Sequence, residues 1–423
     1  MKINKKEYDS YTIHHYKSNK YKTIYIKVIF RKPIKKEEIT KTNLLFAVLG
    51  SGTNKYENEK LINIQMEELY GITTSASTRR VGTNLQQYIT LEVLDDKYTE
   101  PGNLDKSIEL FSELLLDPLV KDNAFDKDIV EREKGIFESY YKRIKENPSY
   151  YAYVRANEEY NDKSIISYRQ NGYMEDLKDI NEHNLYEYYK EFLKSNVIDI
   201  VVVGNIEFTK IDKLINKHFS NLKSISNKEN KYLLNEKLLN KQIIKREKIN
   251  NKQSNLVKLF RGDNLTEFER SFVLKLYSSI LGESTNSKLF NTVREEKSLC
   301  YYINSVYNNY DNTLYIMSGI DRNNYDITLK EINKVIEESK KDLITEKDIE
   351  TEKKSIEINL NNMLENNYKI SNYIEQINIY NRRTIKERIE NYKKITKKDI
   401  VNSINKLKLE SIFLLEGEYN ERN

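Results

Sequence analysis

The stretch LGESTNSKLFNTVREEKSLCYYINS, residues 281–305, decides how the rest of the chain is interpreted. Apolar residues between 286 and 297 recur at helical spacing, whereas those between 299 and 303 alternate as in a half-buried strand. We therefore predict a helix that gives way to a strand at Lys297-Ser298. Arg294 lies in the last turn of this helix, and Tyr301 follows seven residues later.

Arg294 and Tyr301 carry groups suited to holding a peptide at a reacting carbonyl. A guanidinium offers planar donors and a permanent charge to a peptide carbonyl or carboxylate. A phenol can donate to the oxyanion that forms when water attacks a carbonyl. The residues alone also allow a structural interpretation, because an arginine near a helix C-terminus complements the helix dipole and a tyrosine packs well in a strand.

Length and composition exclude several classes of protein. The 423 residues suffice for roughly two to four domains with large cores. The net charge is only +5, from 70 basic and 65 acidic side chains, and no basic stripe with interleaved aromatic residues favours nucleic-acid binding. The single cysteine, Cys300, excludes an internal disulfide framework and a cysteine-based zinc site, and it is compatible with a reducing compartment.

The sequence carries no sign of export or membrane insertion. Its first 23 residues are polar and lack the apolar segment of a secretory signal peptide. No apolar run approaches the roughly 18 residues of a membrane-spanning helix. We therefore expect a soluble, cytoplasmic protein without a membrane span.

Periodicity divides the chain into two halves with a similar order of elements. In the first half it predicts strands at about 21–33, 72–80, 84–94 and 197–205, and helices at about 37–49, 57–69, 104–116, 125–146, 148–161, 178–193 and 208–219. In the second half it predicts strands at about 241–249, 254–261, 299–307, 312–320 and 411–417, helices at about 266–280 and 286–297, and long helices from 325 onward. A polar stretch at 221–240 is the predicted linker between an N-terminal domain, 1–220, and a C-terminal domain, 241–423.

Two pairs of similar segments support a duplication. LGSGTN at 49–54 matches LGESTN at 281–286, and KDIVEREKGIFE at 127–138 matches KDIETEKKSIEI at 347–358. Lys- and Glu-rich helices can resemble one another by chance, but the shared element order favours an internal repeat of roughly 200 residues. We therefore predict an α+β fold of two domains built alike.

The segment R-E-E-K-x-L-x-Y from Arg294 to Tyr301, within this duplicated chain, resembles the Arg/Tyr motif in the C-terminal domain of the insulinase/pitrilysin family of zinc peptidases. The resemblance covers nearly the whole chain. It implies two homologous domains, each an antiparallel-rich mixed sheet covered by helices. It also implies that Arg294 and Tyr301 clamp the substrate and stabilise the oxyanion.

The zinc motif of that family is missing here. Family members carry H-x-x-E-H on the first helix, followed after a few residues by Gly-Thr. In NLLFAVLGSGT, residues 43–53, the first His position falls on Asn43, the Glu position on Phe46 and the second His position on Ala47. An alanine has no ligand atom and a phenylalanine cannot accept a proton, so we expect no metal and no cofactor in this chain.

Two acidic residues correspond to later functional positions of the family. The resemblance places a zinc-ligating Glu on a later helix and another functional Glu seven residues before it, and Glu131 and Glu138 have that spacing. They are either remnants of a lost site or part of a solvated helix face. The four histidines lie at positions 14, 15, 183 and 218. A displaced metal site that combines Glu131, Glu138 and a distant histidine remains an alternative.

The resemblance implies a subunit function. In heteromeric family members one subunit carries zinc, and the other lacks it and contributes the Arg and Tyr across a shared chamber. We therefore expect a non-catalytic subunit without activity of its own, which completes a peptide-processing zinc metallopeptidase together with a zinc-bearing paralogue. The alternative is a peptide-binding or scaffold protein that forms an inactive homodimeric chamber when no such partner is present.

Overall fold

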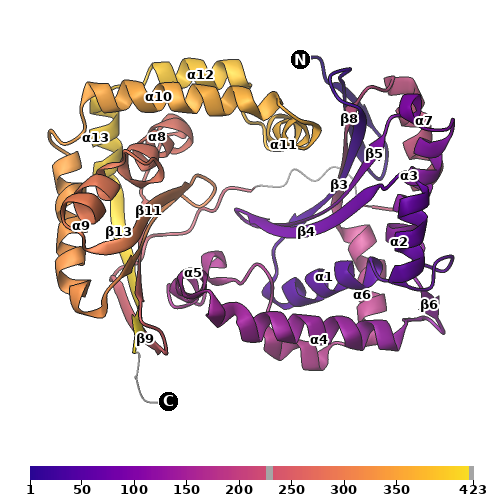
Figure 1. Cartoon of the computed structure of the whole chain (residues 1–423), viewed down its shortest axis with the longest axis horizontal. Helices are drawn as coiled ribbons and strands as arrows, with labels where there is room; N and C mark the ends of the chain where they lie inside the picture. The colour runs from indigo at the N-terminus through magenta and orange to yellow at the C-terminus, as the bar shows by residue number, and fades with distance from the viewer. Residues whose placement is uncertain (225–231, 419–423) are drawn as a thin grey trace. The chain divides into compact units, whose positions relative to one another are not determined.

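The computed structural model describes residues 1–224 and 232–418, which form two compact units. The N-terminal unit comprises residues 1–142, 169–232 and 363–382. The C-terminal unit comprises residues 143–168, 233–362 and 383–423. Each unit therefore includes a segment from the other half of the sequence (Figure 1). Residues 225–231 of the predicted linker lie outside the described residues.

A six-stranded mixed sheet forms the centre of the N-terminal unit. Its strands, in the order in which they pair, are β1 (Asn4–Glu7), β2 (Thr12–Lys17), β8 (Val197–Gly204), β3 (Thr23–Pro33), β5 (Asn84–Leu94) and β4 (Thr73–Val81). The pair β2–β8 is parallel, and the other pairs are antiparallel. The central strands β3 and β8 are buried along nearly their whole length, which explains their almost continuous apolar sequences.

Helices cover both faces of this sheet. The unit contains α1 (Lys36–Leu49), α2 (Glu59–Glu68), α3 (Asn103–Leu116), α4 (Lys127–Arg143), α6 (Glu182–Ser195) and α7 (Phe208–Phe219). Residues of α1, α3, α6 and α7 form the main core with one face of the sheet. On the other face, Ile370 and Ile374 of α11 (Asn367–Asn378) pack against Ile29, Val201 and Val203. Helix α11 thus comes from the second half of the chain.

The C-terminal unit contains a five-stranded mixed sheet of the same topology. Its order is β11 (Cys300–Asn308), β12 (Thr313–Ile320), β10 (Ser254–Gly262), β13 (Leu407–Gly417) and β9 (Ile243–Ile249). Only the pair β13–β9 is parallel. The order β9-β13-β10-β12-β11 repeats β2-β8-β3-β5-β4 of the first unit, strand for strand and direction for direction. The predicted α+β class with two mixed, helix-covered sheets is confirmed.

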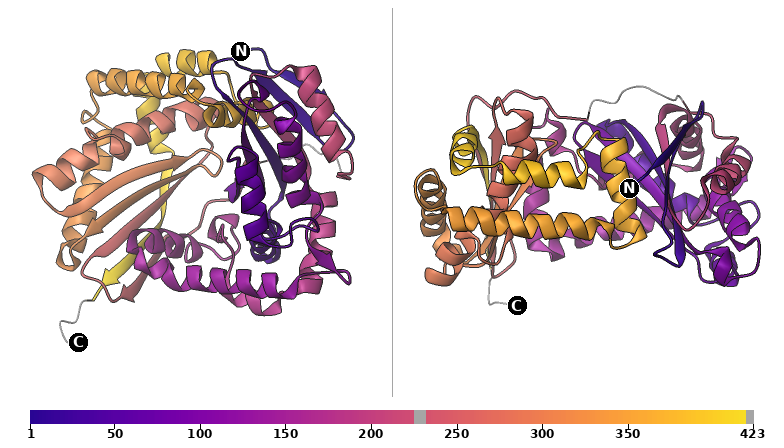
Figure 2. Two further views of the ribbon diagram at one scale, coloured as in Figure 1. Left: turned by 45° about the vertical axis from the view of Figure 1, so that its right-hand side comes forward. Right: turned by 90° about the horizontal axis from the view of Figure 1, so that it is seen from above.

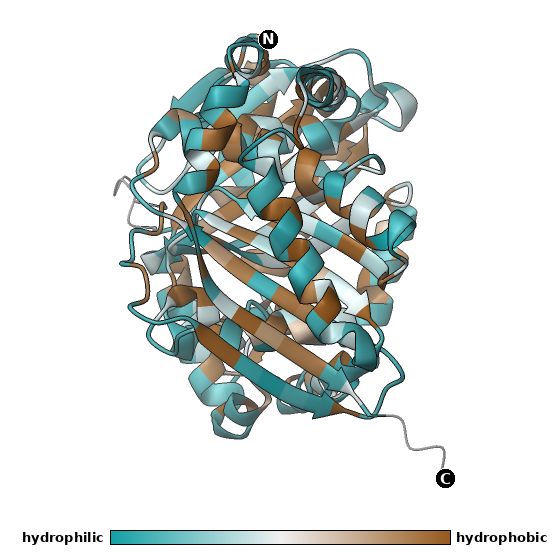
Figure 3. Ribbon diagram, turned by 90° about the vertical axis from the view of Figure 1, so that its left-hand side faces the viewer, coloured by the Kyte–Doolittle hydropathy of each residue, from teal (hydrophilic) through white to brown (hydrophobic). Residues whose placement is uncertain are grey.

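One face of the five-stranded sheet is covered by helices from the second half of the chain. These are α8 (Leu274–Ser278) between two π-helical turns, α9 (Tyr325–Ser339), α10 (Glu346–Asn361), α12 (Ile385–Lys393) and α13 (Lys397–Asn405). Helices α10 and α12 run side by side (Figures 1 and 2). Hydrophobic and hydrophilic residues alternate along these helices and strands (Figure 3), as expected for elements with one buried face. Among the described residues no helix is long and apolar enough to cross a membrane.

The other face is covered by α5 (Pro148–Glu158), which comes from the first half of the chain. Pro148 occupies the first turn, where its missing N–H costs nothing, and the Asn147 side chain accepts a hydrogen bond from the backbone N–H of Tyr150. The matched segments 127–138 and 347–358 lie in α4 and α10. Helix α5 follows α4 in the sequence and belongs to the C-terminal unit, whereas α11 follows α10 and belongs to the N-terminal unit.

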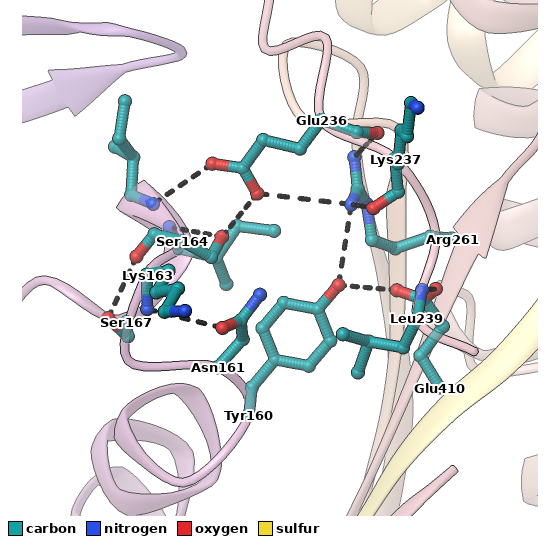
Figure 4. A network of polar contacts seen from close by, with 12 residues as sticks. Tyr160, Asn161, Lys163, Ser164, Ser167, Glu236, Lys237, Leu239, Arg261 and Glu410 are labelled. Carbon is teal, nitrogen blue, oxygen red and sulfur yellow. Dashed lines mark hydrogen bonds and ion pairs between the residues drawn. The ribbon is translucent and has the colours of Figure 1, made fainter. Parts of the chain in front are cut away.

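A polar network fixes the chain that follows α5 (Figure 4). The Tyr160 hydroxyl donates to Glu410 of β13 and accepts a hydrogen bond from Arg261 of β10 at 3.3 Å. The Glu236 carboxylate accepts from the Ser164 hydroxyl at 2.5 Å and from the backbone N–H of Ile165 at 3.1 Å. The C-terminal end of α5 is therefore tied to the middle of the sheet.

Two features differ from the sequence-based prediction. Strands β1 and β2 were not predicted, because TIHHYK carries little apolar alternation, yet it pairs in parallel with β8. The helix predicted over 286–297 contains a π-helical segment, Phe290–Glu296, whose wider turns are not visible in hydropathy spacing.

Candidate functional site

The junction between Arg294 and Tyr301 is a short, backbone-bonded connection. The backbone N–H of Ser298 donates to the Arg294 carbonyl at 3.0 Å, and the N–H of Leu299 donates to the Val293 carbonyl at 3.0 Å. Ser298 has a φ of 51°, the left-handed conformation that ends many helices. This geometry explains how the sequence changes from helix to strand within a few residues.

Arg294 is accessible to solvent on the last turn of the π-helical segment. Its side chain is 42% exposed, and its guanidinium carbon lies 4.9 Å from the centroid of the Phe290 ring. The Glu295 carboxylate is 3.7 Å from the guanidinium, a long surface ion pair that contributes little. Stacking on Phe290 thus orients the guanidinium while it leaves most of the N–H donors free for a ligand.

Tyr301 is the extra residue of a β-bulge at the start of β11. Cys300 pairs with Ile320 and Tyr302 pairs with Gly319, so Tyr301 has no partner of its own in β12. Its side chain is 58% exposed, and its hydroxyl donates to the Asp321 carboxylate at 2.7 Å. This hydrogen bond raises the pKa of the Tyr301 phenol. The phenol therefore keeps the proton that it needs in order to act as a donor.

The structure places both predicted side chains at solvent and not in separate cores. No hydrogen bond or ion pair joins Arg294 to Tyr301 among the interactions of the described residues, and each instead has a local partner. Asp321 is a member of the site that the sequence did not predict. The pairing of the predicted strands 299–307 and 312–320 could have indicated Asp321, because an antiparallel hairpin brings the residues after Ile320 beside the start of β11.

The residues at the zinc-motif positions of α1 do not fit a metal. Asn43 uses its side-chain amide to donate to the carbonyls of Ile39 at 2.9 Å and Gln170 at 3.1 Å. Phe46 is buried, with ring centroids 5.8 Å from Phe30 and 5.4 Å from Phe192. Ala47 is half-buried and has no ligand atom. The helix that holds zinc in the resembling family therefore serves core packing here.

Glu131 and Glu138 both lie on the exposed side of α4. Glu131 forms an ion pair with Lys134 at 2.9 Å, and Glu138 lies 3.7 Å from Lys142. The buried acid of this helix is Glu133, whose carboxylate accepts a hydrogen bond from the Ser51 hydroxyl at 3.0 Å.

The histidines have partners that explain their positions. His14 Nε2 lies 2.8 Å from the buried Asp199 carboxylate, and His15 Nε2 lies 3.0 Å from the Ile206 carbonyl. Burial lowers the pKa of His15. His218 Nε2 lies 2.6 Å from the Asp105 carboxylate. Within residues 1–224 and 232–418, no group of three or more potential ligands could hold a metal ion.

Comparison with known proteins shows which family the chain resembles. A family model described as "Peptidase M16 inactive domain" matches residues 179–356, which include Arg294 and Tyr301. The chain is 26% identical over 418 residues to the probable inactive metalloprotease YmfF of Bacillus subtilis (strain 168), covering 98% of this chain and 97% of that protein. The chain is therefore similar to peptidase M16 proteins of the inactive type. The resemblance to insulinase/pitrilysin peptidases is thereby confirmed.

Two further relatives extend the comparison. The chain is 25% identical over 293 residues to the uncharacterized zinc protease YmxG of Bacillus subtilis (strain 168), covering 69% of this chain and 68% of that protein. The crystal structure of a conserved protein from Enterococcus faecalis V583 matches with a TM-score of 0.91 at 23% identity and covers 99% of both chains, which shows the shared fold. The chain is thus an M16-type homologue of an inactive metalloprotease.

Proposed function

We propose that this chain is the non-catalytic subunit of a heterodimeric zinc metallopeptidase, in which Arg294 and Tyr301 hold the peptide that a zinc-bearing M16 paralogue cleaves. The observation that carries the proposal is the contrast between two positions. The Arg/Tyr segment is exposed and ready to bind, whereas the zinc-motif positions are filled by Asn43, Phe46 and Ala47. A chain with only the first feature needs another polypeptide for the chemistry.

The names of two relatives from one organism support this proposal. Bacillus subtilis (strain 168) encodes both a homologue named as a probable inactive metalloprotease and a homologue named as a zinc protease. In such a pair, zinc in the partner would activate the attacking water. The present chain would contribute only its own side chains.

Each of the two side chains has a distinct part in this proposal. The Arg294 guanidinium donates to a peptide carbonyl and fixes the substrate backbone. The Tyr301 hydroxyl, which donates to Asp321 in the free chain, donates instead to the oxyanion of the substrate. Asp321 keeps the phenol oriented until the substrate arrives.

Mixing experiments test the proposal. The purified chain is combined with a purified M16 protein that carries H-x-x-E-H, and cleavage of a quenched-fluorescence peptide library is measured for each protein alone and for the mixture. We expect cleavage by the mixture to exceed the sum of the separate activities. Arg294→Ala and Tyr301→Phe should each lower kcat/KM on the order of a hundredfold without weakening assembly, which analytical ultracentrifugation checks.

Matched controls separate the site from general surface effects. Arg246 is also an exposed arginine, and its guanidinium lies 4.6 Å from the Tyr325 ring centroid, so Arg246→Ala removes the same kind of stack elsewhere in the same unit. Tyr98 is 45% exposed, and Tyr98→Phe removes another surface hydroxyl. Both control variants should cleave like the wild type. Unchanged cleavage with Arg294→Ala, or a peptide-binding chain that never gains activity beside a partner, would favour the inactive-chamber alternative.

A further inference from the structure

The C-terminal unit contains a hollow of about 430 Å³ that neither the zinc-motif positions nor the Arg/Tyr pair occupies. We call it the tyrosine hollow, because four of its nine lining residues are tyrosines. The lining consists of Ser149, Tyr150, Tyr153, Tyr302, Asn304, Val306, Asn308, Tyr315 and Met317. Its size lies within the range of small-molecule and side-chain pockets, and it is well above the roughly 150 Å³ that admit a benzene ring.

The fold builds this hollow from one sheet face and one helix end. Residues at even positions of β11 and odd positions of β12 share a face, and the register places Asn304 opposite Met317 and Val306 opposite Tyr315. The first turns of α5 supply the wall, with Tyr150 and Tyr153. Helix α5 packs on β10 and β13, and the hollow lies beside it, lined by residues of β11 and β12.

Hydrogen bonds at the far ends of the tyrosines hold the rings in place. The Tyr302 hydroxyl donates to the Asn255 side chain at 2.9 Å, and the Tyr315 hydroxyl donates to Asn157 at 2.7 Å. Tyr153 meets Tyr315 edge to face, with ring centroids 5.2 Å apart. A ligand that enters the hollow therefore finds aromatic walls that are already ordered, so little conformational entropy is lost on binding.

The chemistry of the lining selects an uncharged ligand with a hydrogen-bond donor. None of the nine lining residues is an acid, a lysine, an arginine or a histidine. Burial raises the pKa of Tyr302 to about 12, so this phenol is neutral at physiological pH. The side-chain oxygen of Asn304 is buried and has no hydrogen-bond partner among the described residues. A backbone N–H of an incoming peptide would satisfy this acceptor, which a purely hydrocarbon ligand would not.

The hollow is continuous in sequence with the proposed peptide site. Tyr302 follows Tyr301 directly on β11, and β11 is the end strand of the sheet in the described structure. We propose that the tyrosine hollow binds one large uncharged side chain, aromatic or branched aliphatic, of the peptide held at Arg294 and Tyr301. The inference rests on the proposed function for its substrate, and it adds a residue preference that the Arg/Tyr pair cannot supply, because that pair contacts only backbone.

Binding to the single chain tests the inference without any catalysis. Three acetylated, amidated nonapeptides that differ only at the central residue, Phe, Leu or Lys, are titrated against the purified chain by NMR. Burial of a phenylalanine side chain is sufficient for at least about a tenfold preference, so we expect the Phe and Leu peptides to bind at least tenfold more tightly than the Lys peptide. Equal affinities for the three peptides would overturn the proposal.

Substitutions at exposed positions locate the effect with little risk to folding. Val306 is 42% exposed on the floor of the hollow, and Val306→Asp places a charge there. Ile244 is 58% exposed on β9, at the opposite end of the same sheet, and Ile244→Asp is the matched control. We expect Val306→Asp to abolish the preference for Phe over Lys and Ile244→Asp to preserve it. An unchanged preference in Val306→Asp would refute the assignment.

Arg294→Ala distinguishes the hollow from the clamp. It should weaken the three peptides to a similar extent and leave their ratio unchanged, since Arg294 holds backbone. If the peptide preference and its loss in Val306→Asp are observed while mixtures with zinc-bearing paralogues show no cleavage, the hollow stands and the proposed subunit function fails. If mixtures cleave peptides without regard to the central residue, the subunit function stands and the hollow fails.

Discussion

Replacement of Glu375 by glutamine is the sharpest test of how α11 is held on the sheet of the N-terminal unit. Glu375 and Lys27 of β3 are both fully buried, and the Lys27 ammonium donates to the Glu375 carboxylate at 2.7 Å. The other carboxylate oxygen accepts hydrogen bonds from Gln86 at 3.0 Å and from Arg79. Glu375→Gln keeps the shape of the side chain and removes its charge, so Lys27 and Arg79 no longer have a carboxylate to balance their charges.

The geometry sets the expected size of the effect. Coulomb attraction between unit charges 2.7 Å apart is about 6 kcal/mol at an effective dielectric constant of about 20. Part of this attraction only offsets the desolvation of the two groups. Breaking a buried pair from one side leaves an uncompensated charge and costs about 3–5 kcal/mol. We therefore expect Glu375→Gln to lower the free energy of unfolding of the N-terminal unit by that amount.

Hydrogen exchange read by mass spectrometry measures this loss locally, which matters because two units need not unfold as one. Protection should fall in α11 and in β3. Glu350→Gln is the control, because Glu350 is 60% exposed and pairs with Lys353 at the surface at 2.8 Å, where less than about 1 kcal/mol is at stake. The double variant Lys27→Met with Glu375→Leu should recover much of the loss. Equal effects of Glu375→Gln and Glu350→Gln would refute the reasoning.

The pH dependence of the free energy of unfolding provides an independent check, because the direction of the expected change is known. Burial opposes ionisation of Glu375, but Lys27 and Arg79 outweigh it and hold the pKa of the carboxyl below its ordinary value of 4.5. A depressed folded-state pKa means that the carboxylate stabilises the fold above the unfolded pKa, and that this stability is lost as the pH falls through the folded pKa. The difference between wild type and Glu375→Gln should therefore be constant above about pH 5.5 and narrow on acidification. A gap that widens in acid would contradict the assignment.

Two further predictions concern the backbone around the Arg/Tyr segment. A Cβ added at Gly282 would lie 2.5 Å from the Ser305 backbone nitrogen, so Gly282→Ala should lower the urea midpoint by an amount equivalent to about 1–3 kcal/mol. The control is Gly135→Ala in α4: no atom lies within 4 Å of the added Cβ, so this variant should raise stability by up to about 1 kcal/mol. Because Ser298 is left-handed, Ser298→Gly should retain or raise the melting temperature, whereas Ser298→Val should lower stability by about 1 kcal/mol or more; the opposite ranking by calorimetry would refute the conformational explanation.

Most of the fold could be predicted because strands and helices here follow hydropathy. The matched segments at 49–54 and 281–286 predicted a duplication, and the two sheets indeed share one strand order. Strand β2 was not predicted because two of its three buried side chains are His14 and His15, whose ring nitrogens have polar partners. Hydropathy patterns detect apolar burial only, so a strand with hydrogen-bonded histidines in its core-facing positions is invisible to them.

The exchange of α5 and α11 between the units could not be predicted from periodicity. Each sheet has a second face that needs a helical cover, and the apolar stripe of either helix fits such a face. The information that assigns each helix to its sheet is polar and distant in sequence. Glu375 meets Lys27 across 348 positions, and Tyr160 meets Glu410 across 250. Only the folded chain brings these partners together, so single-sequence patterns do not show which sheet α5 covers.

At the candidate site, the family resemblance selects Arg294 and Tyr301, but the sequence does not predict the partners of their side chains. Arg294 and Tyr301 follow from the change between helical and strand periodicity, whereas the bulge that turns Tyr301 outward and its bond to Asp321 depend on the register of β11 against β12. The sequence placed these two strands correctly but did not provide the one-residue offset. The sequence therefore indicated which residues to consider, but it did not show which groups their side chains contact.

The zinc-motif positions of this chain differ from the family pattern in their packing as well as in their lack of metal ligands. Position 46, where a catalytic glutamate would activate water, carries a phenylalanine that is 5% exposed and packs between Phe30 and Phe192. A carboxylate at this position would be desolvated among aromatic rings, which costs several kcal/mol. The first helix thus makes an apolar contact at the position where the resembling family has a glutamate, while Arg294 and Tyr301 are exposed. This contrast between a packed first helix and an exposed Arg/Tyr segment is what supports the proposed binding role over catalysis by this chain alone.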